Sequence, residues 1–297
     1  FLLSGLSLAR RMRLPLLPEA EITLEANPGT VEAERFAAYR AAGVNRLSLG
    51  IQSFNPTHLK ALGRIHDGEE AKRAIGVARE HFENFNLDLM YALPGQTLAE
   101  ALADVDTAIG FAPPHLSCYQ LTLEPNTHFA AEPPQLPEPD DCADMQDAIE
   151  ARLASAGYVH YETSAFARPG RQSRHNLNYW QFGDYLGIGA GAHGKLTLHD
   201  GQRWEVRRQM RWKQPKQYLT EAAAGRPVQE EFSVGATDLP FEFMMNALRL
   251  NQGFDAALFE QRTSLPLTVV EARLREAENS GLLHREIRDG GGWIAPT

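Results

Sequence analysis

Cysteine is scarce in this sequence. Only Cys118 and Cys142 occur among its 297 residues, and no Cys-x-x-Cys spacing is present. A disulfide framework is therefore excluded, and the composition fits a reducing cytosol. Because iron–sulfur clusters are held by several cysteine thiolates, we expect the cysteines of this chain to hold no such cluster.

Long apolar runs and an excess of positive charge are also missing. No apolar stretch approaches the roughly 18 residues that a membrane span needs. The net charge is −9, which argues against nucleic acid as a partner. Residues 203–216 are a local exception, because Trp204 and Trp212 are interleaved there with six basic residues. A solvated hairpin and loop is the ordinary explanation, and a surface for an anion such as the propionates of a tetrapyrrole is the alternative.

What the sequence does contain is a regular alternation of strands and helices. Short apolar runs predict the strands, and amphipathic segments predict helices between them. The predicted strands are residues 22–26, 46–52, 85–93 and 115–123, and the predicted helices are residues 30–42, 68–81 and 98–111. Near-continuous apolar strands in repeated β-α-β units indicate an α/β fold, with a parallel sheet and helices outside it.

Polar residues lie at or near the carboxyl ends of three consecutive predicted strands. They are Glu25, Gln52 and Asp88. In parallel barrels this end of the sheet carries the active site, so the three side chains are predicted to face one pocket. With Arg64 they suit a ligand that has a ribose diol, an ammonium and a carboxylate, because carboxylates accept from the first two and arginine clamps the third. S-adenosylmethionine offers this combination, as do many other ligands.

The second half of the chain changes character. Residues 131–141 are proline-rich and acidic and predict a connection, followed by a helix over 140–157 and a strand over 158–166. Beyond residue 237 we expect a small winged-helix-like domain, with helices over 239–250, 254–261 and 268–281 and a hairpin formed by 282–287 and 293–295. Its third helix is more acidic than basic, so a structural or docking role is favoured over DNA binding by a regulator.

Two short motifs have open interpretations. GIGAGAHG (187–194) contains G-x-G-x-x-G, but a strand is predicted after it, whereas a dinucleotide-binding fingerprint opens a helix. Its glycines are therefore expected to permit close backbone approach, either to a ligand or between strands. HNLNYW (175–180) could supply His175 as an axial haem ligand or as an acid–base group, and a hydrogen-bonded loop histidine is the ordinary alternative.

Taken in order, the motifs of this chain resemble one known family, the HemW-type radical S-adenosylmethionine proteins, which are related to oxygen-independent coproporphyrinogen III oxidases. The resemblance runs from about residue 21 to 200, and more loosely beyond. It is carried by EITLEANPGT, GVNRLSLGIQSF, LGRIH, NLDLMYALPGQT, PPHLSCYQLTLEPNT, YETSAFARPG, HNLNYW and DYLGIGAGAHGK.

The resemblance implies an incomplete (β/α)6 barrel of the TIM type with a small C-terminal domain. The implied domains are a barrel with its extension over 1–200, a connecting segment over 201–236 and the C-terminal domain over 237–297. The resemblance also implies binding of S-adenosylmethionine through Glu25, Gln52, Arg64 and Asp88, haem ligation by His175, and backbone contacts to the cofactor near Thr122 and His193.

One part of the family pattern is absent. The CxxxCxxC loop and the glycine-rich strand after it are not in this sequence, which begins with Phe1. We therefore expect roughly 70 to 80 preceding residues in the full-length protein, from about 35 residues per barrel unit. The [4Fe–4S] cluster is expected only in that longer protein.

Two functions are compatible with the resemblance. The first is a haem chaperone that delivers haem to apo-haemoproteins in the cytoplasm, with membrane association only through its clients. The second is an oxygen-independent coproporphyrinogen III oxidase, which would make the full-length protein an enzyme of porphyrin biosynthesis. The sequence leaves the choice between chaperone and oxidase open.

Overall fold

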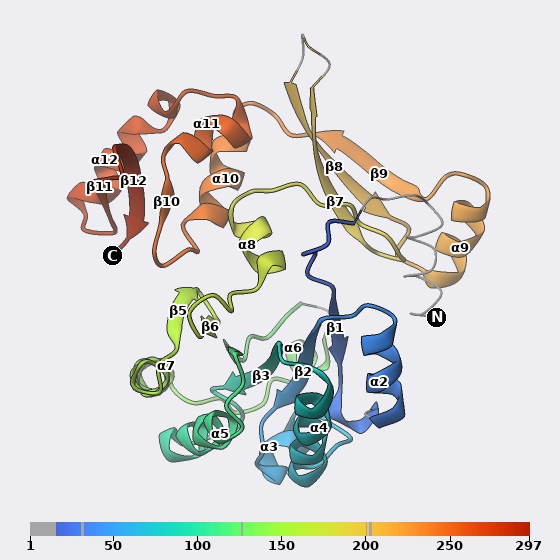
Figure 1. Cartoon of the computed structure of the whole chain (residues 1–297). Coiled ribbons are helices and arrows are strands. Elements are labelled where there is room, and N and C mark those ends of the chain that lie inside the picture. Colours follow the sequence, from blue (N-terminus) through green and yellow to red (C-terminus); the bar gives the residue numbers. More distant parts are fainter. Residues whose placement is uncertain (1–15, 31–32, 126, 200, 202–203) are drawn as a thin grey trace. The chain divides into compact units, whose positions relative to one another are not determined.

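The computed structural model describes residues 16–30, 33–125, 127–199, 201 and 204–297 (Figure 1). Contacts divide the chain into two compact units, one ending at Ser173 and the other beginning at Arg174. The domain limits expected at residues 200 and 236 remain predictions, because the division into compact units at Ser173 tests neither of them.

The first unit is built on a six-stranded sheet with the order β1-β2-β3-β4-β6-β5. Its first four strands are parallel, β6 is antiparallel to β4, and β5 is antiparallel to β6. The bounds are β1 Thr23–Ala26, β2 Arg46–Gln52, β3 Phe85–Tyr91, β4 His115–Gln120, β5 Val159–Glu162 and β6 Ala165–Ala167. The predicted α/β fold with a parallel sheet is confirmed, and the sheet is consistent with a partial barrel.

Helices lie between most of these strands in the sequence, and those other than the short α6 cover one side of the sheet (Figure 1). Their bounds are α2 Ala33–Ala41, α3 Pro56–Ala61, α4 Gly68–His81, α5 Leu98–Gly110, α6 His128–Ala131 and α7 Pro139–Ser155. Asp67 with Glu70, and Thr97 with Glu100, form capping boxes that start α4 and α5 by satisfying free backbone N–H groups. In the described chain, no helix combines the length and apolar character that crossing a membrane demands.

The two sides of the sheet have opposite chemistry. Alternate strand residues such as Leu47, Leu49, Leu87 and Leu89 are buried in the core beneath the helices. The residues between them are largely polar, because successive side chains of a strand point to opposite faces. The core therefore lies on the helix side, and the inner side of the sheet is left for polar groups.

Several local expectations need correction. The single strand predicted over 158–166 is two strands, β5 and β6, separated by a turn. The predicted strands 85–93 and 115–123 end earlier, at Tyr91 and Gln120. The helices α3 and α6 were not predicted, because each is short and shows too few turns for a periodic pattern.

The second unit begins with helix α8 (Arg174–Trp180), so HNLNYW forms a helix and not a loop. A three-stranded antiparallel sheet with the order β7-β8-β9 follows. The bounds are β7 His193–His199, β8 Trp204–Arg211 and β9 Val228–Ser233, and α9 (Pro215–Ala223) lies between β8 and β9. The strand expected after GIGAGAHG is confirmed as β7.

The glycine-rich motif brings two backbone segments together. A Cβ at Gly187 would lie 2.1 Å from the carbonyl oxygen of His193, so only glycine fits there. Nearby, the buried Lys195 ammonium donates to Asp184 at 2.9 Å and to the carbonyl of Phe182 at 3.0 Å. The close approach is between backbone segments, which is one of the two expected roles of these glycines.

Carboxylates neutralise two arginines of the basic segment. Arg207 pairs with Glu205 at 3.1 Å and with Glu231 at 3.2 Å, and Arg208 pairs with Glu242. Arg203 lies outside the described residues. The ordinary explanation, a solvated hairpin and loop, accounts for these two arginines, which lie in the β7–β8 hairpin.

The C-terminal part of this unit has three helices and a small sheet, as predicted. The sheet has the order β10-β12-β11, with its hairpin turn at Asp289 and Gly290. Residues 254–255 form a short strand, so the second helix starts later than predicted. The bounds are α10 Leu239–Ala247, β10 Phe254–Asp255, α11 Ala257–Thr263, α12 Glu271–Asn279, β11 Leu283–Arg288 and β12 Gly291–Pro296.

A glycine pair in α4 tests the packing of the first unit. A Cβ at Gly68 would lie 2.4 Å from the carbonyl oxygen of Phe54, whereas a Cβ at Gly76 meets no atom within 4 Å. Gly68→Ala is expected to lower the free energy of unfolding by about 1–3 kcal/mol through overpacking. Gly76→Ala should raise it by about 0.5–1 kcal/mol through helix propensity. Urea denaturation of both variants measures this, and equal effects would contradict the packing.

Candidate functional site

Neighbouring strands bring three of the predicted site residues to the same side of the sheet. Glu25 is the third residue of β1 and lies opposite Ser48, while Asp88 lies opposite Gly50. Gln52 is the last residue of β2. Asp88 is the fourth residue of β3, so it lies at the centre of its strand and not at the carboxyl end. The strand register nevertheless keeps Glu25, Gln52 and Asp88 within a few residues of one another along the direction of the strands.

Asp88 is a carboxylate held in place by its neighbours. Asn86 donates to its Oδ1 at 2.7 Å, and Ser48 donates to its Oδ2 at 2.9 Å. Burial raises the pKa of Asp88 above its usual value; hydrogen bonds from Ser48, Asn86 and Ser117 oppose this rise, and the charge of Glu25 adds to it. Glu25 and Asp88 therefore lie close enough to interact, and a cationic ligand between them would relieve their repulsion.

Gln52 occupies an unusual backbone position. Its φ is 71°, in the left-handed region, and a β-bulge interrupts the pairing of β2 with β3 between Gly50 and Gln52. A Cβ at Gly50 would lie 3.0 Å from Gln52 Nε2 and 3.1 Å from Asn27 Oδ1. The missing side chain of Gly50 therefore leaves room for the two amide groups over the strand end. Such strained positions cluster at functional sites.

A buried aspartate from a helix holds the segment after Gln52. Asp104 accepts from the Ser53 hydroxyl at 2.5 Å and from the backbone N–H of Phe54 at 2.8 Å. Burial raises the pKa of Asp104, and these hydrogen bonds oppose the rise. The position of Gln52 is thus fixed from α5, which sequence patterns did not reveal.

Arg64 lies between α3 and α4, away from the sheet face itself. Its side chain is exposed and, within the described part of the chain, has no hydrogen-bond or ion-pair partner. Next to it, the buried His66 ring contacts the Ile51 carbonyl at 3.1 Å. A Cβ at Gly29 would lie 3.8 Å from His66 and 3.9 Å from Ile65, so this loop adjoins the loop after β1. The loop that carries Arg64 therefore lies next to the ends of β1 and β2.

The inner face carries further polar residues that we did not single out from the sequence. They are Ser48, Asn86, His115, Ser117, Tyr119 and Tyr161. Burial raises the pKa of Tyr119 to about 12, and the charges of Asp88, Glu162 and Glu25 contribute. A signal was available for the residues of β2, β3 and β4, because polar residues fill most alternate positions of these strands. Tyr161 lies in β5, outside this pattern.

His175, the candidate haem ligand, belongs to the second unit. It is exposed on α8, and its ring meets Tyr179 edge-on at 4.8 Å. Tyr179 in turn contacts Tyr185 at 4.3 Å, and Tyr185 accepts from Arg208 at 2.8 Å. An exposed imidazole beside an aromatic row and an arginine suits a flat anionic ligand.

The remaining candidates are separated between the units. Thr122 lies just beyond β4 in the first unit, and His193 begins β7 in the second. Both are exposed, and the Thr122 hydroxyl donates to Glu124 at 3.0 Å. Glu25, Gln52, Arg64, Asp88 and Thr122 belong to the first unit, and His193 belongs to the second.

The cysteines face away from this site. Cys118 lies in the core beneath the helices, where burial raises the pKa of its thiol to about 12, and Cys142 is buried in α7. Among the described residues, no three His, Cys, Asp or Glu side chains are grouped to hold a metal ion. A cluster ligand set does not fit the cysteines that are present.

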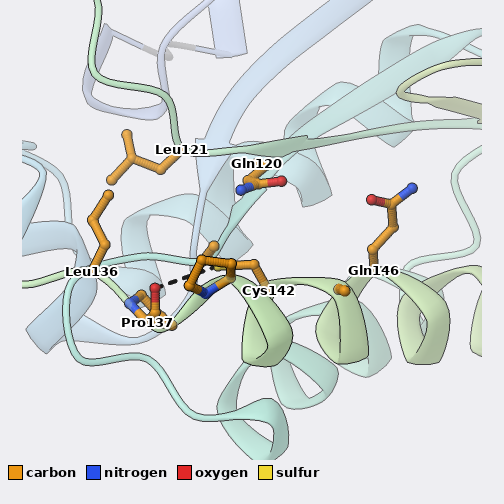
Figure 2. A pocket seen from close by; sticks show the side chains of 9 residues that line it. Gln120, Leu121, Leu136, Pro137, Cys142 and Gln146 are labelled. Atoms are coloured by element: carbon orange, nitrogen blue, oxygen red, sulfur yellow. Dashed lines mark hydrogen bonds between the residues drawn. The ribbon is translucent and has the colours of Figure 1, made fainter.

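A separate cavity of about 280 Å³ opens between β4 and the start of α7. Figure 2 shows Gln146 on one side and Leu136 and Pro137 on the other, with the Cys142 thiol donating to the Pro137 carbonyl at 3.7 Å. Gln120 alternates with the inward residue Tyr119, so this cavity opens on the helix side of the sheet. It is not part of the site formed by Glu25, Gln52 and Asp88.

Comparison with known families defines the class of this protein. Residues 3–108 match the model of the radical SAM superfamily, and residues 234–290 match the HemN C-terminal domain. The chain is thus a radical SAM protein with a HemN-type C-terminal domain. It is also similar to the crystallised coproporphyrinogen III oxidase HemN of Escherichia coli, with a TM-score of 0.78 over 99% of this chain and 70% of that one; at 24% identity, this shows the fold alone.

Curated relatives narrow the class to a family. The chain is 51% identical to the heme chaperone HemW of Escherichia coli over 92% of its own length and 71% of that protein. It is 52% identical to the heme chaperone HemW of Haemophilus influenzae over 86% of its length and 65% of that protein. This chain belongs to the HemW heme chaperone family. It spans about two thirds of the length of these relatives.

Asp104 offers a test of how the Gln52 segment is held. Asp104→Ala is expected to lower the free energy of unfolding by about 2–4 kcal/mol, because the Ser53 hydroxyl and the Phe54 N–H lose a buried acceptor. Asp106→Ala, in the same helix, removes a half-exposed ion pair with Arg152 and should cost about 0–1 kcal/mol. Guanidinium denaturation of the two variants makes the comparison, and similar losses would contradict the anchoring role.

Proposed function

We propose that this chain is the S-adenosylmethionine- and haem-binding part of a radical SAM haem chaperone that delivers haem to apo-haemoproteins in the cytoplasm. The observation that carries the proposal is the approach of Glu25, Gln52 and Asp88 on adjacent strands of one sheet. The sequence identity of 51% and 52% to two proteins named heme chaperone HemW supports the proposed haem binding.

The donor set on the sheet fits S-adenosylmethionine chemically. Glu25 and Asp88 would accept from the ribose hydroxyls and the ammonium, and the Gln52 amide can both donate and accept. Arg64, exposed and unpaired, would clamp the ligand carboxylate. Two nearby carboxylates would also favour a sulfonium cation over a neutral nucleoside. Bound beside a reduced cluster, S-adenosylmethionine supplies radical chemistry.

The cluster itself is proposed only for a longer protein that includes this chain. Cys118 and Cys142 are buried on the helix side, so they cannot offer thiolates to a cluster at the strand ends. No step through the cluster is derived from the residues of this chain. Their proposed work is to bind and orient the cofactor and to keep Asp88 and Glu25 facing it.

His175 is proposed as the haem iron ligand. Its exposure on α8 would let iron approach the imidazole, and Tyr179 would pack against the porphyrin edge. Arg208 lies beside Tyr185 and could neutralise a propionate, although Glu242 already pairs with it. We propose haem and apo-haemoproteins as the partners on this basis.

An oxidase activity is the alternative, and one experiment separates the two functions. A longer protein with its cluster reconstituted anaerobically is supplied with coproporphyrinogen III, and the products are separated chromatographically. A chaperone should bind haem stably and form no protoporphyrinogen IX. Formation of that product would defeat the chaperone proposal, whatever the haem affinity.

Arg64→Ala is expected to weaken S-adenosylmethionine binding by about 1.5–3 kcal/mol, because a charge-assisted hydrogen bond to the ligand carboxylate is lost. Isothermal titration calorimetry of the folded variant measures this. Arg73→Ala, which removes an exposed arginine of α4, is the matched control and should leave the affinity unchanged. If the Arg64 variant binds as tightly as its control, the proposed clamp is wrong.

His175→Ala is expected to weaken haem binding and shift the Soret band, because the proposed axial nitrogen is removed. Haem titration followed by absorbance measures both effects. His284→Ala, at an exposed position of β11, is the control and should bind haem as the parent protein does. An unchanged spectrum and affinity in the His175 variant would refute the ligand assignment.

A further inference from the structure

A row of hydrogen-bonded groups crosses the inner face of the sheet and ends at Asp88. The Ser173 backbone N–H donates to the Tyr161 oxygen at 3.2 Å, and the Tyr161 hydroxyl lies 2.8 Å from His115 Nε2. His115 Nδ1 lies 2.7 Å from Asn86 Oδ1, and Asn86 Nδ2 donates to Asp88 Oδ1 at 2.7 Å. Ser173, Tyr161, His115 and Asn86 are all buried, so water does not replace these contacts.

The two ends of this row fix the direction of every hydrogen bond within it. A backbone N–H can only donate, and an ionised carboxylate can only accept. The NH2 group of Asn86 must therefore face Asp88, which leaves its Oδ1 to accept the proton of His115 Nδ1. In a neutral ring Nε2 then carries no proton, so Tyr161 donates to it. Every proton in the row points toward Asp88.

His115 is suited to this fixed arrangement. Burial lowers the pKa of the imidazole well below its usual value, and the positive charge of Arg46 lowers it further. A flipped ring would present carbon atoms to Asn86 and Tyr161 and lose both hydrogen bonds. The Tyr161 ring also packs edge-on against it at 5.6 Å.

We propose that Asn86, His115 and Tyr161 form a one-directional hydrogen-bond relay that positions the ionised Asp88 carboxylate for its ligand. This proposal rests on the proposed function, in which that ligand is S-adenosylmethionine. The three residues are positioning residues, since none of them is proposed to touch the ligand.

The relay answers an energetic difficulty at Asp88. Asp88 is half-buried, and a carboxylate withdrawn from water is costly unless groups around it donate hydrogen bonds. Asn86 donates to one oxygen, and Ser48 donates to the other at 2.9 Å. Ser117 donates to Asn86 Oδ1 at 3.1 Å and so reinforces the amide orientation. Aligned hydrogen bonds in a low-dielectric site strengthen one another, so the carboxylate is oriented before the ligand arrives.

The first test reads the proton of His115 directly. Nitrogen-15 NMR of histidine-labelled protein should show a neutral ring protonated at Nδ1, unchanged between about pH 5.5 and 8; the signal is assigned by its loss in His115→Asn. Tyr161→Phe should shift the Nε2 signal. Tyr158→Phe, which removes another buried tyrosine hydroxyl bonded to the Pro113 carbonyl, should not. An Nε2–H tautomer, or a ring that titrates in this range, overturns the relay.

The second test reads ligand binding by calorimetry with S-adenosylmethionine. Tyr161→Phe and His115→Leu should weaken binding about three- to ten-fold, as expected for one lost hydrogen bond. His115→Asn keeps a donor toward Asn86 and should recover part of the affinity, and Tyr158→Phe should bind as the parent protein does. Circular dichroism shows which variants are folded. If His115→Leu does not fold, the conservative variant Tyr161→Phe still decides the question.

The outcomes separate the relay from the proposed function. If Asp88→Asn binds S-adenosylmethionine as tightly as the parent protein, the proposed binding site is wrong, and the relay has no ligand to position. If Asp88→Asn binds weakly while folded Tyr161→Phe and His115→Leu bind normally, the site stands and only the relay is overturned.

Discussion

A half-buried carboxylate on the inner face of the sheet is the constraint on which the polar side of the first unit depends. Asp88 is half-buried and burial raises its pKa, so hydrogen bonds from its neighbours are needed to hold its charge. The donors come from β2 and from β3 itself, and their own orientations are set by β4 and β5. The polar side of the sheet is therefore organised around one side chain, although its residues are dispersed along the sequence.

The two faces of the sheet carry different kinds of residue, with polar groups around Asp88 on the inner face and apolar groups beneath the helices on the other. Strand residues alternate, so β4 places His115 and Ser117 inward while Leu116 and Cys118 enter the core beneath the helices. A thiol on the helix side cannot serve chemistry on the inner side. Gly50 belongs to the inner set, and its missing side chain provides the space that Gln52 and Asn27 occupy. The alternation of side chains along each strand therefore determines both which residues pack in the core and which residues line the site.

The sequence predicted the parts of this arrangement that local patterns encode. Strand and helix positions followed from apolar periodicity, and Glu25, Gln52 and Asp88 stood out as polar groups near strand ends. Tyr161 could not be found this way, because it reaches His115 only through the hairpin of β5 and β6, which the sequence suggested was a single strand. The left-handed backbone of Gln52 and the support from Asp104 depend on long-range contacts. Arg64 was suggested by charge, but its place beside the loop after β1 was not.

The end of the relay falls where the first compact unit ends. Ser173 contributes the backbone N–H that starts the row, and the next residue, Arg174, begins α8, which carries His175. A backbone donor cannot be moved by changing a side chain, so this end of the row is fixed by the path of the chain. The residue at which the chain leaves the first unit is therefore linked by one hydrogen bond to the row that reaches Asp88. The peptide bond between Ser173 and Arg174 therefore links the unit that carries the proposed cofactor residues to the unit that carries the proposed haem ligand His175.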